Sequence, residues 1–311
     1  MTEPLQPLNM GGILDRAIQV YRGKFSLFAG LAVFPGLAQL AVGLASVHPK
    51  TAADPSGAHI FLVMVSYIAS LVFTIANLVI QAIATAAICL AASKVLFGES
   101  IAIRTAFGAF TSKAGRLVGL EFLQGLYAVW PLIIVGVIAA VVAVAASSPY
   151  IIIPMFILGS IPCIALYVRC ALAFPACAIE DLPATTAFGR GVKLSERGRW
   201  RICGGIFSPA VAAIGFTVGW TFVIAALQRT SPLLAGNPLA SAGLTGIVTF
   251  VADIVFIPIS AIVLTVLYYD QRIRREGYDI ERMMHDAGLV APGLPLAGER
   301  PAAPGAEEAK Q

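Results

Sequence analysis

Six long apolar runs constrain this chain more than any other feature of its sequence. A helix that crosses the hydrocarbon core of a bilayer needs about 20 mostly apolar residues. Backbone groups in lipid must find their hydrogen bonds within the segment, and this favours helices. We therefore predict an all-α polytopic membrane protein with six transmembrane helices. The predicted spans are residues 26–47, 60–96, 117–146, 150–179, 202–227 and 244–269.

Composition supports the same class. Hydrophobic residues make up 58% of the chain and charged residues only 12%, against about 25% charged residues in an ordinary soluble domain. Lipid requires apolar side chains on the outer surface, so a membrane protein can fold with so few charges. The five cysteines all fall in or beside apolar runs, which does not indicate a secreted disulfide framework.

Two of the predicted spans are irregular. The second contains 37 residues and would reach about 55 Å as one helix, against a hydrocarbon core of about 30 Å. Two alternatives follow: the helix projects into the cytoplasm, or it is broken. The fourth contains Pro154, Pro162 and Pro175, and proline inside a helix removes a hydrogen bond and favours a kink.

The distribution of lysine and arginine predicts the orientation. With the N-terminus inside, eighteen basic residues lie in cytoplasmic segments, two (Lys50 and Arg229) in outer loops, and Arg169 within a span. Basic residues near span ends accumulate on the cytoplasmic side. We predict a multi-pass protein of the cell (inner) membrane with both termini in the cytoplasm.

A short internal repeat precedes the spans. The tetrapeptide Thr-Ala-Phe-Gly occurs at 105–108 and again at 186–189, each time before a basic stretch and a new span, and 12–25 takes the same place before the first span. These segments predict three repeats, each an interfacial amphipathic helix followed by a transmembrane hairpin. Their basic faces suit an anionic inner leaflet. The alternative is that they are ordinary charged loops.

The last span continues into a charged segment at 267–281. Tyr268 and Tyr269 suit the headgroup level, opposite charges four residues apart favour a continuing helix, and Gly277 favours its end. We predict a membrane domain over 1–288 that ends in this cytoplasmic helix, and a disordered tail over 289–311. The candidate cytoplasmic interaction residues are Tyr268, Tyr269, Asp270, Arg272, Arg274, Arg275 and Glu276.

Three segments resemble the bacterial glycerophosphoryl diester phosphodiesterase membrane-domain family. They are ILDRA with the following Tyr21-Arg22, FPACAIE at 174–180 with RWR at 199–201, and YYDQRIRREGYD at 268–279. The resemblance implies a membrane domain that in some members precedes a separate catalytic domain. Only 30 residues follow Glu281, whereas a catalytic barrel needs about 250, so we expect no phosphodiesterase activity in this chain.

Four polar residues fall within the apolar runs: Asp253, Glu121, Arg169 and Asn77. An ionisable group costs about 2.5–3.5 kcal/mol at the centre of a membrane helix, so Asp253, Glu121 and Arg169 are candidates for a functional role. Asn77, with Gln81, Thr217 and Thr221, is a candidate hydrogen-bond partner for Asp253. For Glu121 and Arg169 there are three alternatives: a structural ion pair, independent charges that face the headgroups, and a substrate site. For Asp253 the alternatives are a hydrogen-bonded or crevice-facing carboxyl and a proton-linked one.

No pattern in the sequence indicates catalysis, a metal or a cofactor. His48 and His59 share an outer loop with Asp54, but their irregular spacing favours plain loop residues. We therefore expect a non-catalytic integral membrane protein that organises lipid of the anionic inner leaflet, a protein partner or a second copy of itself, and no nucleic acid. The alternative function is a small-molecule transporter or permease.

Overall fold

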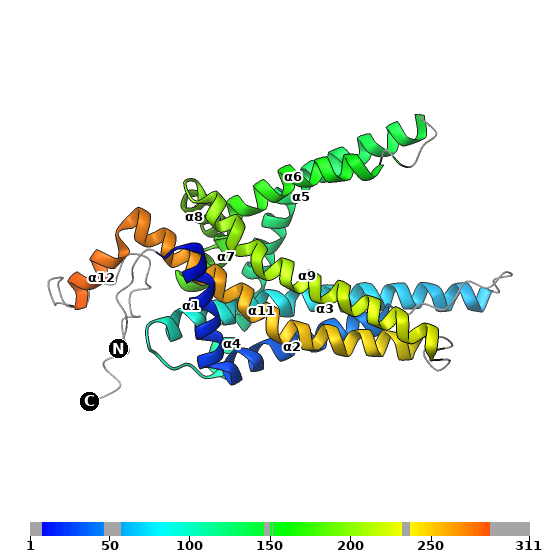
Figure 1. Cartoon of the computed structure of the whole chain (residues 1–311), viewed down its shortest axis with the longest axis horizontal. Helices are drawn as coiled ribbons and strands as arrows, with labels where there is room; N and C mark the ends of the chain where they lie inside the picture. The colour runs from blue at the N-terminus through cyan, green and yellow to red at the C-terminus, as the bar shows by residue number, and fades with distance from the viewer. Residues whose placement is uncertain (1–7, 47–56, 146–149, 151, 232–236, 287–311) are drawn as a thin grey trace. The chain divides into compact units, whose positions relative to one another are not determined.

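The structure is a computed structural model that describes residues 8–46, 57–145, 150, 152–231 and 237–286. The regular elements in these ranges are helices (Figure 1). The helices are α1 (Met10–Gly23), α2 (Phe25–Ala45), α3 (Gly57–Leu96), α4 (Ile103–Thr111), α5 (Ala114–Ala145), α6 (Ile152–Cys170), α7 (Ala173–Ile179), α8 (Ala184–Ser195), α9 (Arg199–Thr230), α11 (Pro238–Glu276) and α12 (Tyr278–Asp286).

The described residues contain six helical segments that are long and apolar enough to cross a membrane. This confirms the predicted all-α polytopic class and the number of spans. The segments are Phe25–Ala45, Ile60–Leu96, Ala114–Ala145, Ile153–Ile179, Arg199–Thr230 and Leu239–Glu276.

Of the two spans predicted to be irregular, the second is one continuous helix and the fourth is interrupted. Helix α3 runs unbroken through 40 residues, about 60 Å at 1.5 Å per residue, so the broken alternative for the second span is wrong. The fourth span is interrupted: α6 ends at Cys170 and α7 begins at Ala173. Pro175 lies in the first turn of α7, where a missing backbone N–H breaks no helical hydrogen bond.

The order of the elements agrees with the predicted repeat. A short helix precedes two long ones in α1–α2–α3, in α4–α5–α6 and in α8–α9–α11, and α7 is an addition after the second hairpin. The two Thr-Ala-Phe-Gly segments fall in α4 and α8. The repeat therefore corresponds to a recurring succession of helices.

The chain packs as two compact units. The first comprises the described residues of Met1–Ile13, Gly119–Gly204 and Leu264–Gln311, and the second those of Leu14–Val118 and Gly205–Val263. Helices α1, α5, α9 and α11 contribute residues to both units. The predicted disordered tail, 289–311, lies outside the described residues.

In the first unit α8 packs against α6 and α7. Gly191 permits a very close approach, because a Cβ at this position would lie 2.3 Å from the backbone nitrogen of Ala173. The rings of Tyr127 and Phe188 meet edge to face, with centroids 5.1 Å apart. Small residues and a close backbone contact thus set the distance between α7 and α8.

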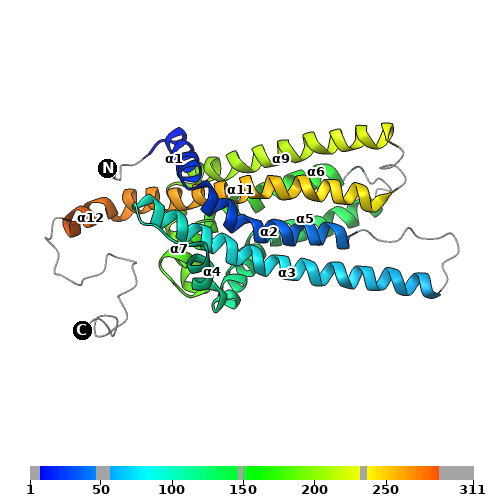
Figure 2. The ribbon, with the colours of Figure 1, turned by 90° about the horizontal axis from the view of Figure 1, so that it is seen from below.

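In the second unit α2 and α3 lie side by side (Figure 2), and α4 packs against both. Glycines on α2 again permit close approaches. A Cβ at Gly30 would lie 2.6 Å from Ile103 of α4, and one at Gly36 would lie 2.9 Å from Phe250 of α11. Tyr21 of α1 donates a hydrogen bond to the carbonyl of Ile254 at 3.1 Å, and burial raises the pKa of this phenol.

Candidate functional site

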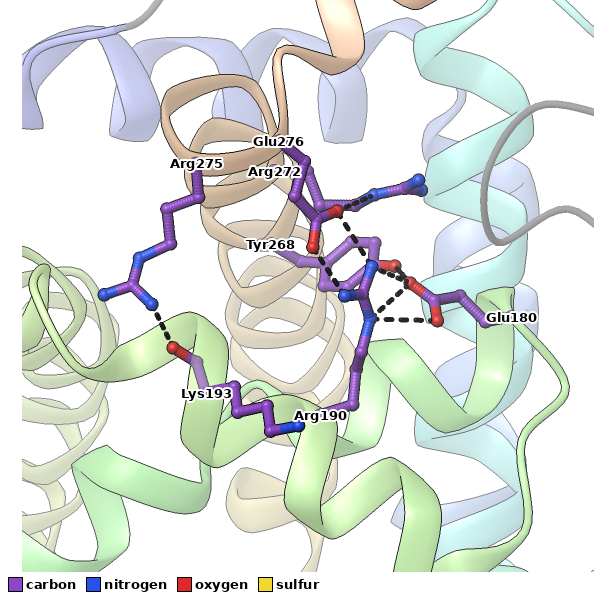
Figure 3. A network of polar contacts seen from close by, with 7 residues as sticks. All are labelled: Glu180, Arg190, Lys193, Tyr268, Arg272, Arg275 and Glu276. Atoms are coloured by element: carbon purple, nitrogen blue, oxygen red, sulfur yellow. Dashed lines mark hydrogen bonds and ion pairs between the residues drawn. The ribbon is translucent and has the colours of Figure 1, made fainter.

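A partly buried network of charged side chains in the first unit centres on Arg190 of α8 (Figure 3). Its Nε donates to both carboxylate oxygens of Glu180 at 3.1 Å. Its Nη1 and Nη2 donate to the two carboxylate oxygens of Glu276 at 2.5 and 2.8 Å. One guanidinium therefore joins the end of α7 to the end of α11. Charge-assisted, two-point hydrogen bonds of this kind are the strong ones.

The turn between α7 and α8 brings Glu180 and Arg190 together. Glu180 directly follows α7, and Asp181 adopts a left-handed backbone with φ of 54°, a conformation that aspartate tolerates better than most residues. Pro183 then precedes α8. Burial alone would lower the pKa of Arg190, but its hydrogen bonds to Glu276 and Glu180 and their charges raise it. The guanidinium is thus held in its charged form.

Two residues of α11 complete this network. Tyr268 donates its phenolic hydrogen to Glu180, and Arg272 donates to Glu276 at 3.2 Å. The Arg272 guanidinium lies 4.1 Å from the ring centre of Tyr278 and 5.7 Å from that of Tyr268, which is cation–π distance. Arg272 is only 1% exposed, so its charge is neutralised by protein groups and is withdrawn from solvent.

A second cluster surrounds the buried carboxylate of Asp270, also on α11. It accepts hydrogen bonds from the backbone of Leu8 at 3.1 Å, from Arg201 at 3.2 Å and from Arg274 at 3.0 Å. Arg201 and Arg274 both donate to the carbonyl of Leu8 as well. The cluster holds the segment before α1 and the start of α9 against α11. All these residues belong to the first unit.

The structure changes the interpretation of the predicted interaction residues. The helical ion pairs Asp270–Arg274 and Arg272–Glu276 are confirmed, as is the end of the helix at Gly277, whose φ is 64°. Tyr268, Tyr269, Asp270 and Arg272 are buried, so the two tyrosines do not present their rings to headgroups. Arg274, Arg275 and Glu276 keep some exposure but are engaged with other protein groups.

Sequence reasoning missed the partners of this segment. Glu180, Arg190 and Arg201 each bond to α11, although 69 to 88 residues separate the partners along the chain. The signal was present in part, because Glu180 and Arg201 belong to the segments that carry the family resemblance. Which charges meet depends on helix packing, which the sequence pattern does not show.

The junction of α8 and α9 presents charges that the networks do not use. Arg197 and Arg199 are exposed and form no hydrogen bond or ion pair with the described residues. Trp200 between Arg199 and Arg201 is 89% exposed, more than any other large hydrophobic side chain that the structure describes. The junction therefore offers two free cations and a free indole ring.

Two of the polar residues predicted within the membrane do not meet. Among the described residues, Glu121 and Arg169 form no ion pair, with each other or with another group, and Glu121 Oε2 and Arg169 Nε are buried without a hydrogen-bond partner. The ion-pair alternative is therefore not realised. Gln124, one turn after Glu121, instead donates to the carbonyl of Cys170 at 2.6 Å. This bond satisfies a carbonyl at the break between α6 and α7.

Asp253 and Asn77 lie in the second unit. The Asp253 side chain is close to Gly36 of α2. A Cβ added at Gly36 would lie 3.7 Å from the Cβ of Asp253. It has no hydrogen-bond or ion-pair partner among the described residues. Asn77 of α3 donates to Gln39 of α2 at 2.9 Å. Neither Asn77 nor the other predicted partners, Gln81, Thr217 and Thr221, bonds to Asp253.

No cluster of three or more potential metal ligands occurs within the described ranges. His48 and Asp54, considered above as loop residues, lie outside these ranges, as does the side chain of His59. Comparison of the chain with protein-family models, with curated proteins and with solved structures found no match. The chain is an integral membrane protein with six candidate transmembrane helices among the described residues.

Proposed function

We propose that this membrane protein is a non-catalytic module that organises anionic lipid at the cytoplasmic face, through the junction of α8 and α9. The observation that carries the proposal is the 89% exposed side chain of Trp200 beside Arg197 and Arg199, which have no partner among the described residues. Tryptophan is enriched at the level of the headgroups. Each basic residue near an anionic leaflet contributes about 1 kcal/mol of attraction.

The two charged networks hold this junction in place. A Cβ at Gly198, between the two free arginines, would lie 2.5 Å from the side chain of Gln271. On either side, Arg275 donates to the carbonyl of Lys193 and Arg201 bonds to Asp270. The α11 segment thus acts as a support for the junction, and its own arginines are occupied in that support. We infer that the lipid contact lies at Arg197, Arg199 and Trp200.

The test compares lipid enrichment between variants. The full chain is reconstituted in vesicles of equal parts phosphatidylglycerol and phosphatidylcholine and then extracted in mild detergent. The retained lipids are quantified by mass spectrometry. We expect the wild-type protein to retain more phosphatidylglycerol, and the triple variant R197Q/R199Q/W200A to lose most of this preference.

The control variant R22Q/R229Q removes the same number of charges. Its arginines lie elsewhere in the chain and have no partner among the described residues. It should keep the preference. A wild-type protein with no more phosphatidylglycerol than an unrelated six-span protein would overturn the proposal. The resemblance to the phosphodiesterase membrane-domain family remains a hypothesis beside it.

A second candidate function, a transporter or permease, is favoured by Asp253. This carboxyl is placed within the last span against Gly36 and has no partner among the described residues, and intramembrane ionisable groups often mark transport pathways. Solute uptake by reconstituted vesicles that depends on a proton gradient, with that dependence changed by D253N, would support it. Unchanged proton dependence in D253N would remove Asp253 from the pathway.

A further inference from the structure

A groove in the second unit lies between α4 and the helices α2 and α3. Its volume is about 680 Å³, within the range of roughly 300–1,000 Å³ that small-molecule sites occupy. Its lining is almost entirely apolar. The lining includes Phe34, Ile80, Ile83, Arg104, Phe107 and Gly108.

The walls of this groove are fixed by packing. The rings of Phe34 on α2 and Phe107 on α4 meet edge to face, with centroids 5.1 Å apart. The N-terminal turn of α4 is anchored where Ile103 fits against Gly30. Ala106 and Phe110 of α4 are buried. The groove is therefore a preformed feature between packed helices.

One charge stands in this apolar lining. Arg104 is exposed and makes no hydrogen bond or ion pair with the described residues. A guanidinium binds phosphate oxygens through two parallel hydrogen bonds. The groove thus combines an apolar lining with one cation, Arg104, that has no partner among the described residues. This combination matches a molecule with a hydrocarbon chain at one end and a phosphate at the other.

We propose that this groove holds one anionic phospholipid of the surrounding leaflet, with an acyl chain along Ile80, Ile83 and Phe107 and the phosphate at Arg104. The α2 and α3 walls belong to membrane-spanning segments, so lipid reaches the groove directly from the bilayer. Bilayer hydrocarbon is as apolar as the groove, so burial alone gives the chain little advantage. The preference for an anionic headgroup therefore comes from Arg104.

The proposal is tested on the full chain in vesicles of phosphatidylcholine that contain a trace of phosphatidylglycerol with a diazirine in one acyl chain. After illumination the labelled peptides are identified by mass spectrometry. We expect more label on the segments around Ile80–Ile83 and Phe107–Thr111 than on Phe61 and Leu71 of α3. Phe61 and Leu71 are exposed, so their labelling measures contact with ordinary surrounding lipid. Unlabelled phosphatidylglycerol should compete far better than phosphatidylcholine.

Two pairs of variants test the geometry. A Cβ at Gly108 or at Gly115 meets no atom within 4 Å, but only Gly108 lines the groove. G108W should therefore lower groove labelling at least about tenfold, equivalent to about 1.4 kcal/mol, and G115W should not. R104Q should lower the preference for phosphatidylglycerol roughly fivefold, as expected for one cation near the headgroups, whereas R22Q should leave it unchanged.

Groove labelling that G108W does not reduce, relative to Phe61 and Leu71, would overturn the inference, as would equal competition by both lipids. Should G108W fail to fold, I83W closes the same groove from α3. The choice of an anionic lipid rests on the proposed function. The experiments can nevertheless contradict the groove site without contradicting the function proposed for the junction of α8 and α9. Loss of enrichment only in R197Q/R199Q/W200A, with an unlabelled groove, would leave the proposed function standing and remove this site.

Discussion

Arg190 on α8 and Glu276 at the end of α11 face each other, and the two terminal guanidinium nitrogens each donate to one carboxylate oxygen, at 2.5 and 2.8 Å. The two residues are 86 positions apart in the chain. The same guanidinium also holds Glu180, so its removal would leave two carboxylates without their main partner. The unit is stabilised by a few such polar connections between helices and by close contacts at small residues.

Substitution R190Q tests the first of these connections. We expect it to lower the free energy of unfolding by roughly 3 kcal/mol, the lower end of the range for removing one partner of a buried pair, because Arg190 and Glu276 keep 27% and 30% exposure. K193Q removes the same charge from the same helix, but only the backbone carbonyl of Lys193 is engaged with α11, so it should change stability by less than about 0.5 kcal/mol. Unfolding midpoints in one detergent give the comparison. Equal midpoints for the two variants would contradict it.

The contact between α7 and α8 depends on the absence of a side chain at Gly191. G191A places a methyl group 2.3 Å from a backbone nitrogen of α7, which a rotamer change cannot relieve. We expect a loss at or above the upper end of the ~1–3 kcal/mol range for overpacking. Gly189 on the same helix has no atom within 4 Å of an added Cβ, so G189A should be neutral or stabilising by up to about 1 kcal/mol. Thermal unfolding of the purified pair checks this, and a G191A protein as stable as G189A would show that α7 and α8 do not approach so closely.

Gly36 gives a milder test in the second unit. An added Cβ would lie 2.9 Å from the ring of Phe250, and a ring at a helix contact moves more easily than backbone. G36A should therefore cost about 1–2 kcal/mol, within the usual range for overpacking. G43A, on the same helix with open space around it, serves as the matched control. Higher stability for G36A than for G43A would place Phe250 away from α2.

The predicted orientation is tested by thiol labelling in intact cells. Ser112, which follows α4, falls on the predicted cytoplasmic side, and Asn237, which precedes α11, on the outer side. A membrane-impermeant maleimide should label N237C in intact cells and S112C only after permeabilisation, because basic residues concentrate on the cytoplasmic side. The wild-type chain, with its five native cysteines, gives the background. Labelling of S112C in intact cells would reverse the orientation.

The sequence by itself determined the class of this protein, because the requirement for internal backbone hydrogen bonds in lipid leaves long apolar runs no alternative to helices. It also determined local features of α11: the ion pairs Asp270–Arg274 and Arg272–Glu276, and the end at Gly277, since these depend on spacing within one helix.

Only the tertiary structure decided which long-range charges meet. It paired Arg190 with Glu180 and Glu276, left Glu121 and Arg169 without an ion pair among the described residues, and buried Tyr268 and Arg272. Periodicity assigns a residue to a face of its own helix, but not to the helix that covers that face. Side-chain volume and the glycines that admit close contact make that choice, and they leave Arg104, Arg197 and Arg199 without a partner among the described residues.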